Sequence, residues 1–145
     1  MFVFSRHKSN VVEVIDEKTL RVITTLSDTK HEMVMFVYLS YPELVVEDIE
    51  SEMIRMPDGE CMPAIENLKK IIGLEIGPGL KKSVVERVGD KNGCTHLTDM
   101  LVESAKAAIQ ARFTLKYQQL EKQDRRDALQ EELKDNCVLY TDKNS

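Results

Sequence analysis

The residue types best suited to metal or thiol chemistry gather at the start of a predicted helix. Cys94 and His96 lie two residues apart in the segment Gly93-Cys94-Thr95-His96-Leu97. A helix N-terminus favours a thiolate, because the first backbone N–H groups and the helix dipole are positive there. Zinc and iron both accept thiolate and imidazole ligands. The spacing therefore indicates a candidate metal or thiol site. On spacing alone, however, a cysteine that is buried as a small apolar residue and takes part in no chemistry is the commoner interpretation.

Two further candidate ligands lie at the ends of other predicted elements. Cys61 comes just before a helix predicted to begin at Pro63, and His31 opens a predicted strand. Because the ends of elements can converge at one edge of a sheet, we expect a tetrahedral metal site that takes zinc or iron. Its predicted ligands are His31, Cys61, Cys94 and His96.

A thiol-dependent enzyme with Cys94 as its nucleophile is the alternative to a metal site. In that alternative His96 or His31 acts as the base, and no substrate can be read from the sequence. Asp99 lies three residues after His96, but an acid in the first turn of a helix is favourable without any catalytic role. Cys137 lies in a polar tail and is expected to take no part in a site. A binding module is therefore favoured over an enzyme.

The composition excludes several classes of partner. The 145 residues include 20 Lys and Arg against 25 Asp and Glu, which gives a net charge of −5. Acidic residues are concentrated between positions 43 and 60. Because nucleic acids and anionic lipids require basic surfaces, we expect neither as a partner. The apolar runs are also far shorter than the roughly 20 residues that a membrane span needs.

The N-terminal residues and the cysteines predict a cytoplasmic location. Residues 1–7 lack the basic region and the long apolar stretch that mark a secretory signal. The chain holds 3 cysteines, an odd number, and cytoplasmic thiols stay reduced. We therefore expect the cysteines to serve a metal or a reaction rather than a disulfide.

The elements that must position these ligands change in character near Pro57. Before it, alternating apolar residues and β-branched residues indicate strands. These segments are residues 11–16, 20–26, 31–41 and 44–56, with a short edge strand at residues 2–5. The strand from His31 is apolar on both faces, which predicts a central place in the sheet.

After Pro57 the apolar residues recur at helical spacing. Three helices are predicted at residues 63–72, at residues 80–88 and from His96 onward, the last one capped by Thr95. We therefore expect an α+β fold, in which a mostly antiparallel sheet is followed by three helices on one of its faces.

The predicted domain spans residues 1–120, and residues 121–145 are expected to form a charged helical extension with a frayed tail. The last apolar positions of the extension, Leu129 and Leu133, share one helix face. A protein partner or a second copy of the chain could dock there. A regulatory or interaction subunit is thus a further functional alternative.

In the order of its segments the sequence resembles the IscU and NifU iron–sulfur scaffold domains over residues 31–109. In that family a sheet precedes the helices, and three cysteines gather at one end. Here the segment from Cys61 to Ile65 and the helix after Cys94 are similar to the second and third cysteine segments. His31 takes the place of the first cysteine. The resemblance implies a SufE/IscU-like fold.

The segment around Cys94 is also similar to a bacterial domain family of unknown function that is marked by a Gly-Cys-Thr-His-Leu motif, and this family is the nearer relative. Two features of the scaffold family are missing. Met33 stands where that family has an aspartate that promotes cluster release, and its Leu-Pro-Pro-Val-Lys motif is absent. The resemblances therefore imply a metal-binding or ligand-binding module rather than a working scaffold.

Overall fold

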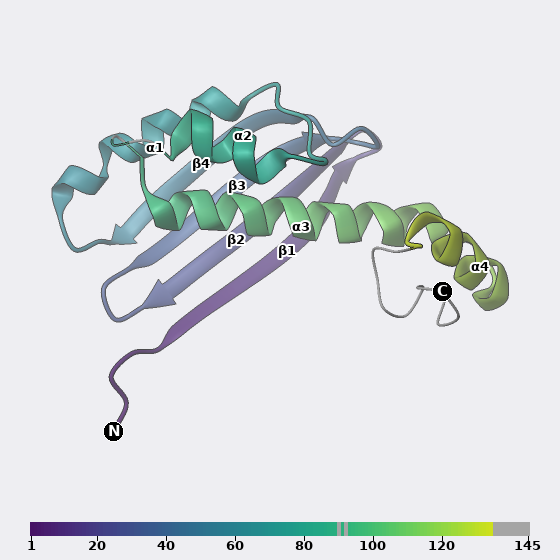
Figure 1. Cartoon of the computed structure of the whole chain (residues 1–145), viewed down its shortest axis with the longest axis horizontal. Helices are drawn as coiled ribbons and strands as arrows, with labels where there is room; N and C mark the ends of the chain where they lie inside the picture. Colours follow the sequence, from purple (N-terminus) through teal and green to yellow (C-terminus); the bar gives the residue numbers. More distant parts are fainter. Residues whose placement is uncertain (90, 92, 135–145) are drawn as a thin grey trace. The chain divides into compact units, whose positions relative to one another are not determined.

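The structure is a computed structural model that describes residues 1–89, 91 and 93–134. Strands come first and helices follow, as predicted (Figure 1). The strands are β1 Arg6–Asp16, β2 Thr19–Asp28, β3 Glu32–Ser40 and β4 Val46–Arg55. The helices are α1 Pro63–Asn67, α2 Leu80–Val88, α3 Thr95–Tyr117 and α4 Lys122–Glu132, with 3-10 turns η1 Gly59–Cys61 and η2 Leu68–Ile71.

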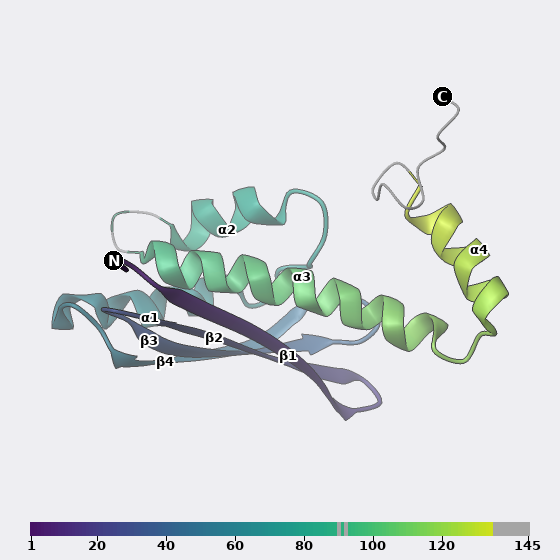
Figure 2. The same cartoon turned by 90° about the horizontal axis from the view of Figure 1, so that it is seen from below.

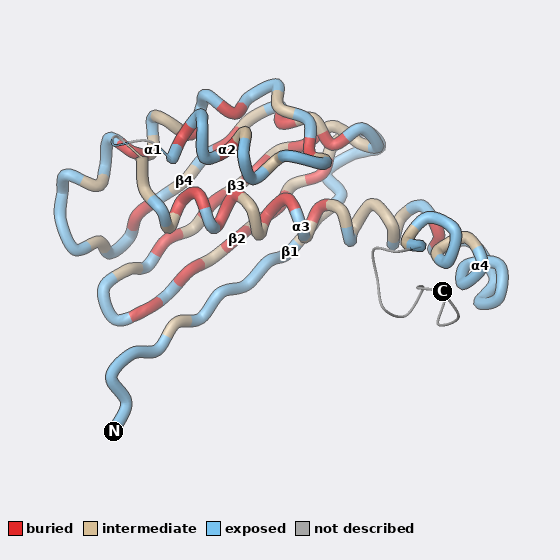
Figure 3. Tube along the Cα trace, in the orientation of Figure 1, coloured by how far each residue is buried: buried red, intermediate tan, exposed pale blue. Residues whose placement is uncertain are grey.

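The four strands form one antiparallel sheet in the order β1-β2-β3-β4. Strand β3 lies between β2 and β4, as its two apolar faces predict. Every second residue of β2 and β3 is buried on one side of the sheet (Figure 3). A slip of one residue would turn the polar side of β2, which carries Arg21 and Thr25, towards the core, so the alternation in β2 favours the observed register.

Helices α1 and α2 and the first part of α3 cover one face of the sheet, as Figure 2 shows, which confirms the predicted α+β fold. The apolar stripe of α3 is buried at Leu97, Met100, Leu101, Ala105 and Ala108. None of the helices within the described residues has the length and apolar character needed to cross a lipid bilayer.

A buried polar contact fixes α3 over β2. The hydroxyls of Thr24 and Ser104 lie 2.7 Å apart in the core, and both residues are fully or almost fully buried. Each hydroxyl has a second acceptor nearby, the Met100 carbonyl for Ser104 and the side-chain oxygen of Asn10 for Thr24, so one hydroxyl donates to the other and the second donates to its own acceptor. Because buried hydroxyls need partners, this network specifies how α3 lies on the sheet and so where its first turn falls.

The N-terminal strand differs from the prediction. Residues 1–5 form no strand, and β1 begins at Arg6 instead of Val11. The reason is the register with β2, in which Arg6 is the partner of Asp28, the last residue of β2. No residue of β2 remains to pair with the chain before Arg6.

Two helix boundaries also differ from the prediction. Thr95 is the first residue of α3 rather than its cap, and the hydroxyl of Thr98 donates to the carbonyl of Cys94. The predicted helix over residues 63–72 is divided into α1 and η2, and Gly73 follows with a φ of 86°. That positive φ is a conformation that glycine adopts without strain, so Gly73 ends the helical segment.

The described residues 113–134 belong to a second compact unit, which contains the end of α3 and helix α4. Within it the Tyr117 hydroxyl donates to the Glu132 carboxylate, and Arg125 donates to the Tyr117 carbonyl at 3.0 Å. No residue of α4 is buried. Polar bonds therefore join α4 to the end of α3. Cys137 lies outside the described residues.

Removal of residues 121–145 is expected to lower the thermal midpoint of the domain by only a few degrees. Helix α4 buries no residue, so its loss removes little apolar burial from the folded state. Circular dichroism melts of the full and truncated chains measure this difference. A drop of more than about 10 °C would show that the extension stabilises the sheet.

Candidate functional site

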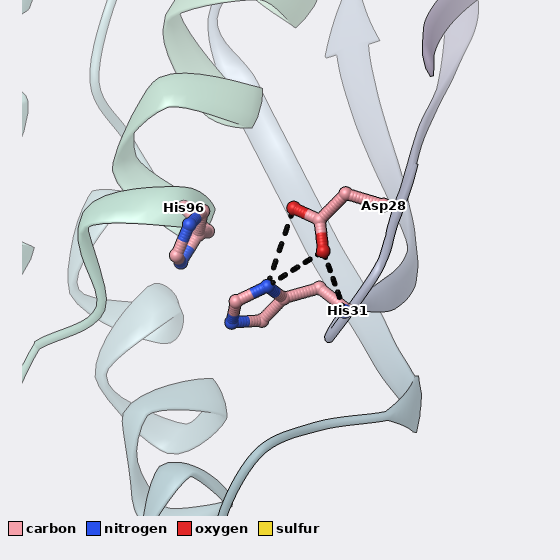
Figure 4. Close-up of side chains that lie close together, drawn as sticks. All are labelled: Asp28, His31 and His96. Atoms are coloured by element: carbon pink, nitrogen blue, oxygen red, sulfur yellow. Dashed lines mark hydrogen bonds and ion pairs between the residues drawn. The ribbon is translucent and has the colours of Figure 1, made fainter. Parts of the chain in front are cut away.

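Three side chains from different elements meet at one end of the sheet (Figure 4). Asp28 ends β2, His31 lies just before β3, and His96 lies in the first turn of α3. Each offers an oxygen or nitrogen of the kind that binds metal, and these atoms all lie within 4.8 Å of one another. The centroids of the two imidazole rings are 4.1 Å apart.

The Asp28 carboxylate is at the centre of the site, and its side chain is fully buried. Its Oδ1 accepts from the backbone N–H groups of Lys30 and His31 at 2.8 and 2.7 Å, and from Nδ1 of His31 at 3.0 Å. Its Oδ2 accepts from Nε and Nη2 of Arg6 at 2.9 and 2.7 Å.

These bonds decide the protonation of Asp28. Burial alone raises the pKa of Asp28, but the N–H donors of Lys30, Arg6 and His31 outweigh burial and hold it well below its ordinary value. Asp28 is therefore a carboxylate that only accepts. It follows that the proton between Asp28 and His31 lies on Nδ1 of His31, and that Nε2 of a neutral His31 carries the lone pair.

The local sequence explains why Asp28 stands at this position. An aspartate that accepts from backbone N–H groups two and three residues later stabilises a tight turn, here the turn that joins β2 to β3. The backbone N–H of Asp28 also donates to the His31 carbonyl at 2.8 Å, and Arg55 of β4 donates to the Asp28 carbonyl at 2.7 Å. Asp28 thus shapes the turn and positions His31 at once.

His96 is held in one tautomer by Arg6. Nη2 of Arg6 lies 3.1 Å from Nε2 of His96. A guanidinium can only donate, so Nε2 accepts and the proton of the neutral ring lies on Nδ1. Burial, together with the nearby His31 and Arg6, lowers the pKa of His96, which favours this neutral ring. On the other side of the ring, Nδ1 lies 3.9 Å from Sγ of Cys94.

Comparison with known proteins places the chain in a family. A family match covers residues 8–110, which is more than half of the chain and includes Asp28, His31 and His96. The chain belongs to the family described as "Protein of unknown function (DUF2889)". No curated protein and no solved structure matches it. The resemblance to IscU and NifU domains therefore has no support from these comparisons.

In this DUF2889 domain two of the predicted ligands, His31 and Cys94, lie next to a third, His96. Arg6, which is bonded to Asp28, lies at Nε2 of the His96 ring, and Cys94 lies at Nδ1. His31 stacks against the ring, with the two centroids 4.1 Å apart. Cys61 and Cys94 are both half-buried free thiols that line one pocket of about 600 Å³. Because one imidazole cannot direct both nitrogens to a single ion, an ion binds His96 either at Nε2, next to Arg6 and Asp28, or at Nδ1, next to Cys94.

Asp28 and Arg6 are the site residues that the sequence analysis missed. Asp28 and His31 lie three residues apart with a turn between them, and this spacing could have indicated a carboxylate–histidine pair. Carboxylates commonly accept a hydrogen bond from a metal-bound histidine and so orient it. Arg6 carries no such local sign. It reaches the site only because the β1–β2 register places it opposite Asp28.

Proposed function

We propose that this DUF2889 domain binds one divalent transition-metal ion, zinc or iron, through Asp28, His31 and His96. The observation that carries the proposal is the convergence of a buried carboxylate and two imidazoles, with donor atoms within 4.8 Å of one another. Zinc and ferrous iron both accept this donor set. With bonds of about 2.0–2.1 Å, tetrahedral donors lie roughly 3.4 Å apart, so modest side-chain rotations would complete the site.

Arg6 already occupies the position that the ion would take. Its Nη2 bridges Oδ2 of Asp28 and Nε2 of His96, so a positive charge lies between two of the proposed ligands. The Arg6 side chain is 27% exposed and can turn towards solvent. Metal binding would therefore exchange a guanidinium for an ion, while Oδ1 of Asp28 keeps its bonds to the turn.

Calorimetric titration of the full, metal-free chain with Zn²⁺ tests the proposal. We expect one ion per chain, with binding weakened at least about tenfold in His31→Ala and in His96→Ala. His7→Ala is the matched control, since His7 is exposed and lies outside the site. Unchanged affinity in both site variants, or no binding to the unaltered chain, would contradict the proposal.

A thiol-dependent enzyme is the second candidate, favoured by the contact between Cys94 and His96 and by the adjacent pocket. In the tautomer held by Arg6, Nδ1 of His96 donates, so it can stabilise a Cys94 thiolate but cannot take the thiol proton. Iodoacetamide labelling at neutral pH, followed by mass spectrometry, tests this candidate. An activated Cys94 should react markedly faster than Cys61. Equal rates would count against an enzyme.

A further inference from the structure

A pocket lies between the N-terminal segment and the turn that joins β2 to β3, and Arg6, Asp28 and His31 belong both to its lining and to the site described above. Its volume is about 280 Å³, and Val3, Phe4, Arg6, Lys30 and His31 contribute to its lining. Val3 is 87% exposed and Phe4 is 58% exposed. Apolar surface of this kind, next to a few polar groups, is typical of sites for small molecules.

Several polar atoms of the lining residues have no hydrogen-bond partner within the described residues. Arg6 uses Nε and Nη2 for Asp28 and His96, which leaves both N–H groups of Nη1 available. Nζ of Lys30 and Nε2 of His31 are likewise without a partner in that part of the chain. The Phe4 ring lies 5.1 Å from the guanidinium carbon of Arg6 and helps to fix it in place.

The charges of the pocket favour a ligand with a single negative charge. Arg6 and Lys30 are cations, and Asp28 is the carboxylate among the lining residues. The oxygens of Asp28 are already occupied by donors of Arg6, Lys30 and His31, so it neutralises one of the two cations. One positive charge remains beside the apolar side chains of Val3 and Phe4. A monoanion balances that charge, whereas a dianion exceeds it.

We propose that this pocket binds a small monocarboxylate with a short apolar tail. Its carboxylate accepts charge-assisted hydrogen bonds from Arg6 and Lys30, and its tail packs against Val3 and Phe4. Asp28 acts as a positioning residue, because it holds Arg6 and His31 in place. This inference does not depend on metal binding.

Butyrate and its uncharged analogue butyramide, titrated into the full chain in the presence of EDTA, test this proposal. The NMR signals of the His31 ring report on the pocket. We expect a saturable shift with butyrate and none with butyramide, because only butyrate carries the negative charge.

Matched lysine variants complete the experiment. Lys30→Gln should weaken butyrate binding about fivefold, as expected for the loss of one exposed ion pair. Lys8→Gln, another exposed lysine, should leave it unchanged. Lys30 is exposed in a turn, so its variant should fold normally. Three results would each overturn the proposal: no saturable shift with butyrate, an equal shift with butyramide, or equal affinity in Lys30→Gln.

Discussion

Arg6→Gln is expected to raise the affinity for Zn²⁺ by about tenfold, although it removes a residue of the site. Nη2 of Arg6 lies 2.7 Å from Oδ2 of Asp28 and 3.1 Å from Nε2 of His96, so an ion must displace the guanidinium before it can use either atom. Glutamine carries no charge, and the competing cation is then gone. Calorimetric titrations of the two proteins at neutral pH measure the difference.

Arg21→Gln is the matched control for this substitution. Arg21 also pairs with a carboxylate across β1 and β2, but its partner is Glu13, which is not part of the site. The zinc affinity of the Arg21→Gln variant should equal that of the unaltered chain. Weaker zinc binding in Arg6→Gln would contradict the account, because it would mean that Arg6 supports the ligands rather than excluding the ion.

Asp28→Asn is expected to lower the thermal midpoint by roughly 10 °C, the largest loss among substitutions in the site. Both carboxylate oxygens accept N–H donors, which come from Arg6, Lys30 and His31. Asparagine offers one oxygen and one NH₂ group, so some of these donors would face another donor in a buried place. Thermal melts followed by circular dichroism at neutral pH measure the loss.

Asp48→Asn provides the comparison for Asp28→Asn. The hydrogen bond from Lys69 likewise holds the pKa of Asp48 below its ordinary value, but both side chains are about half exposed. Solvent can replace that ion pair, so the midpoint should change little. An equal drop of the thermal midpoint in Asp28→Asn and Asp48→Asn would show that the burial of Asp28 does not increase its contribution to stability.

The Asp28 carboxylate also makes the thermal stability of the chain depend on pH. The pKa of Asp28 is lower in the folded chain than the ordinary value of about 3.9 that it has when unfolded. The contribution of Asp28 to the free energy of unfolding is therefore complete above about pH 5. It is lost as the pH falls through the carboxyl range towards the pKa that Asp28 has in the folded chain. Between about pH 5 and pH 2 the unaltered chain should lose more thermal stability than Asp28→Asn. Parallel curves would contradict this prediction.

The order of elements could be predicted because it follows from local patterns. The apolar run from Met33 to Leu39 and the helical spacing from Leu97 to Ala108 are properties of short segments. The start of β1 could not be predicted in this way. The segment from Arg6 to Asn10 has no apolar alternation, and it is a strand only because β2 pairs with it.

Local patterns also selected two of the three side chains that meet at this end of the sheet. His31 and His96 were selected because both lie at element ends, and their rings prove to be neighbours. Which nitrogen of His96 faces which group could not be predicted, because it depends on Arg6, ninety positions away in the sequence. This single contact assigns Nε2 to Arg6 and leaves Nδ1 facing Cys94.

Zinc K-edge X-ray absorption of the zinc-loaded full chain tests the proposed metal site most directly. Ligation by Asp28, His31 and His96 predicts a first shell of nitrogen and oxygen alone, at about 2.0–2.2 Å. A Zn–S distance near 2.3 Å would contradict it, because that sulfur would place the ion on the Cys94 side of His96.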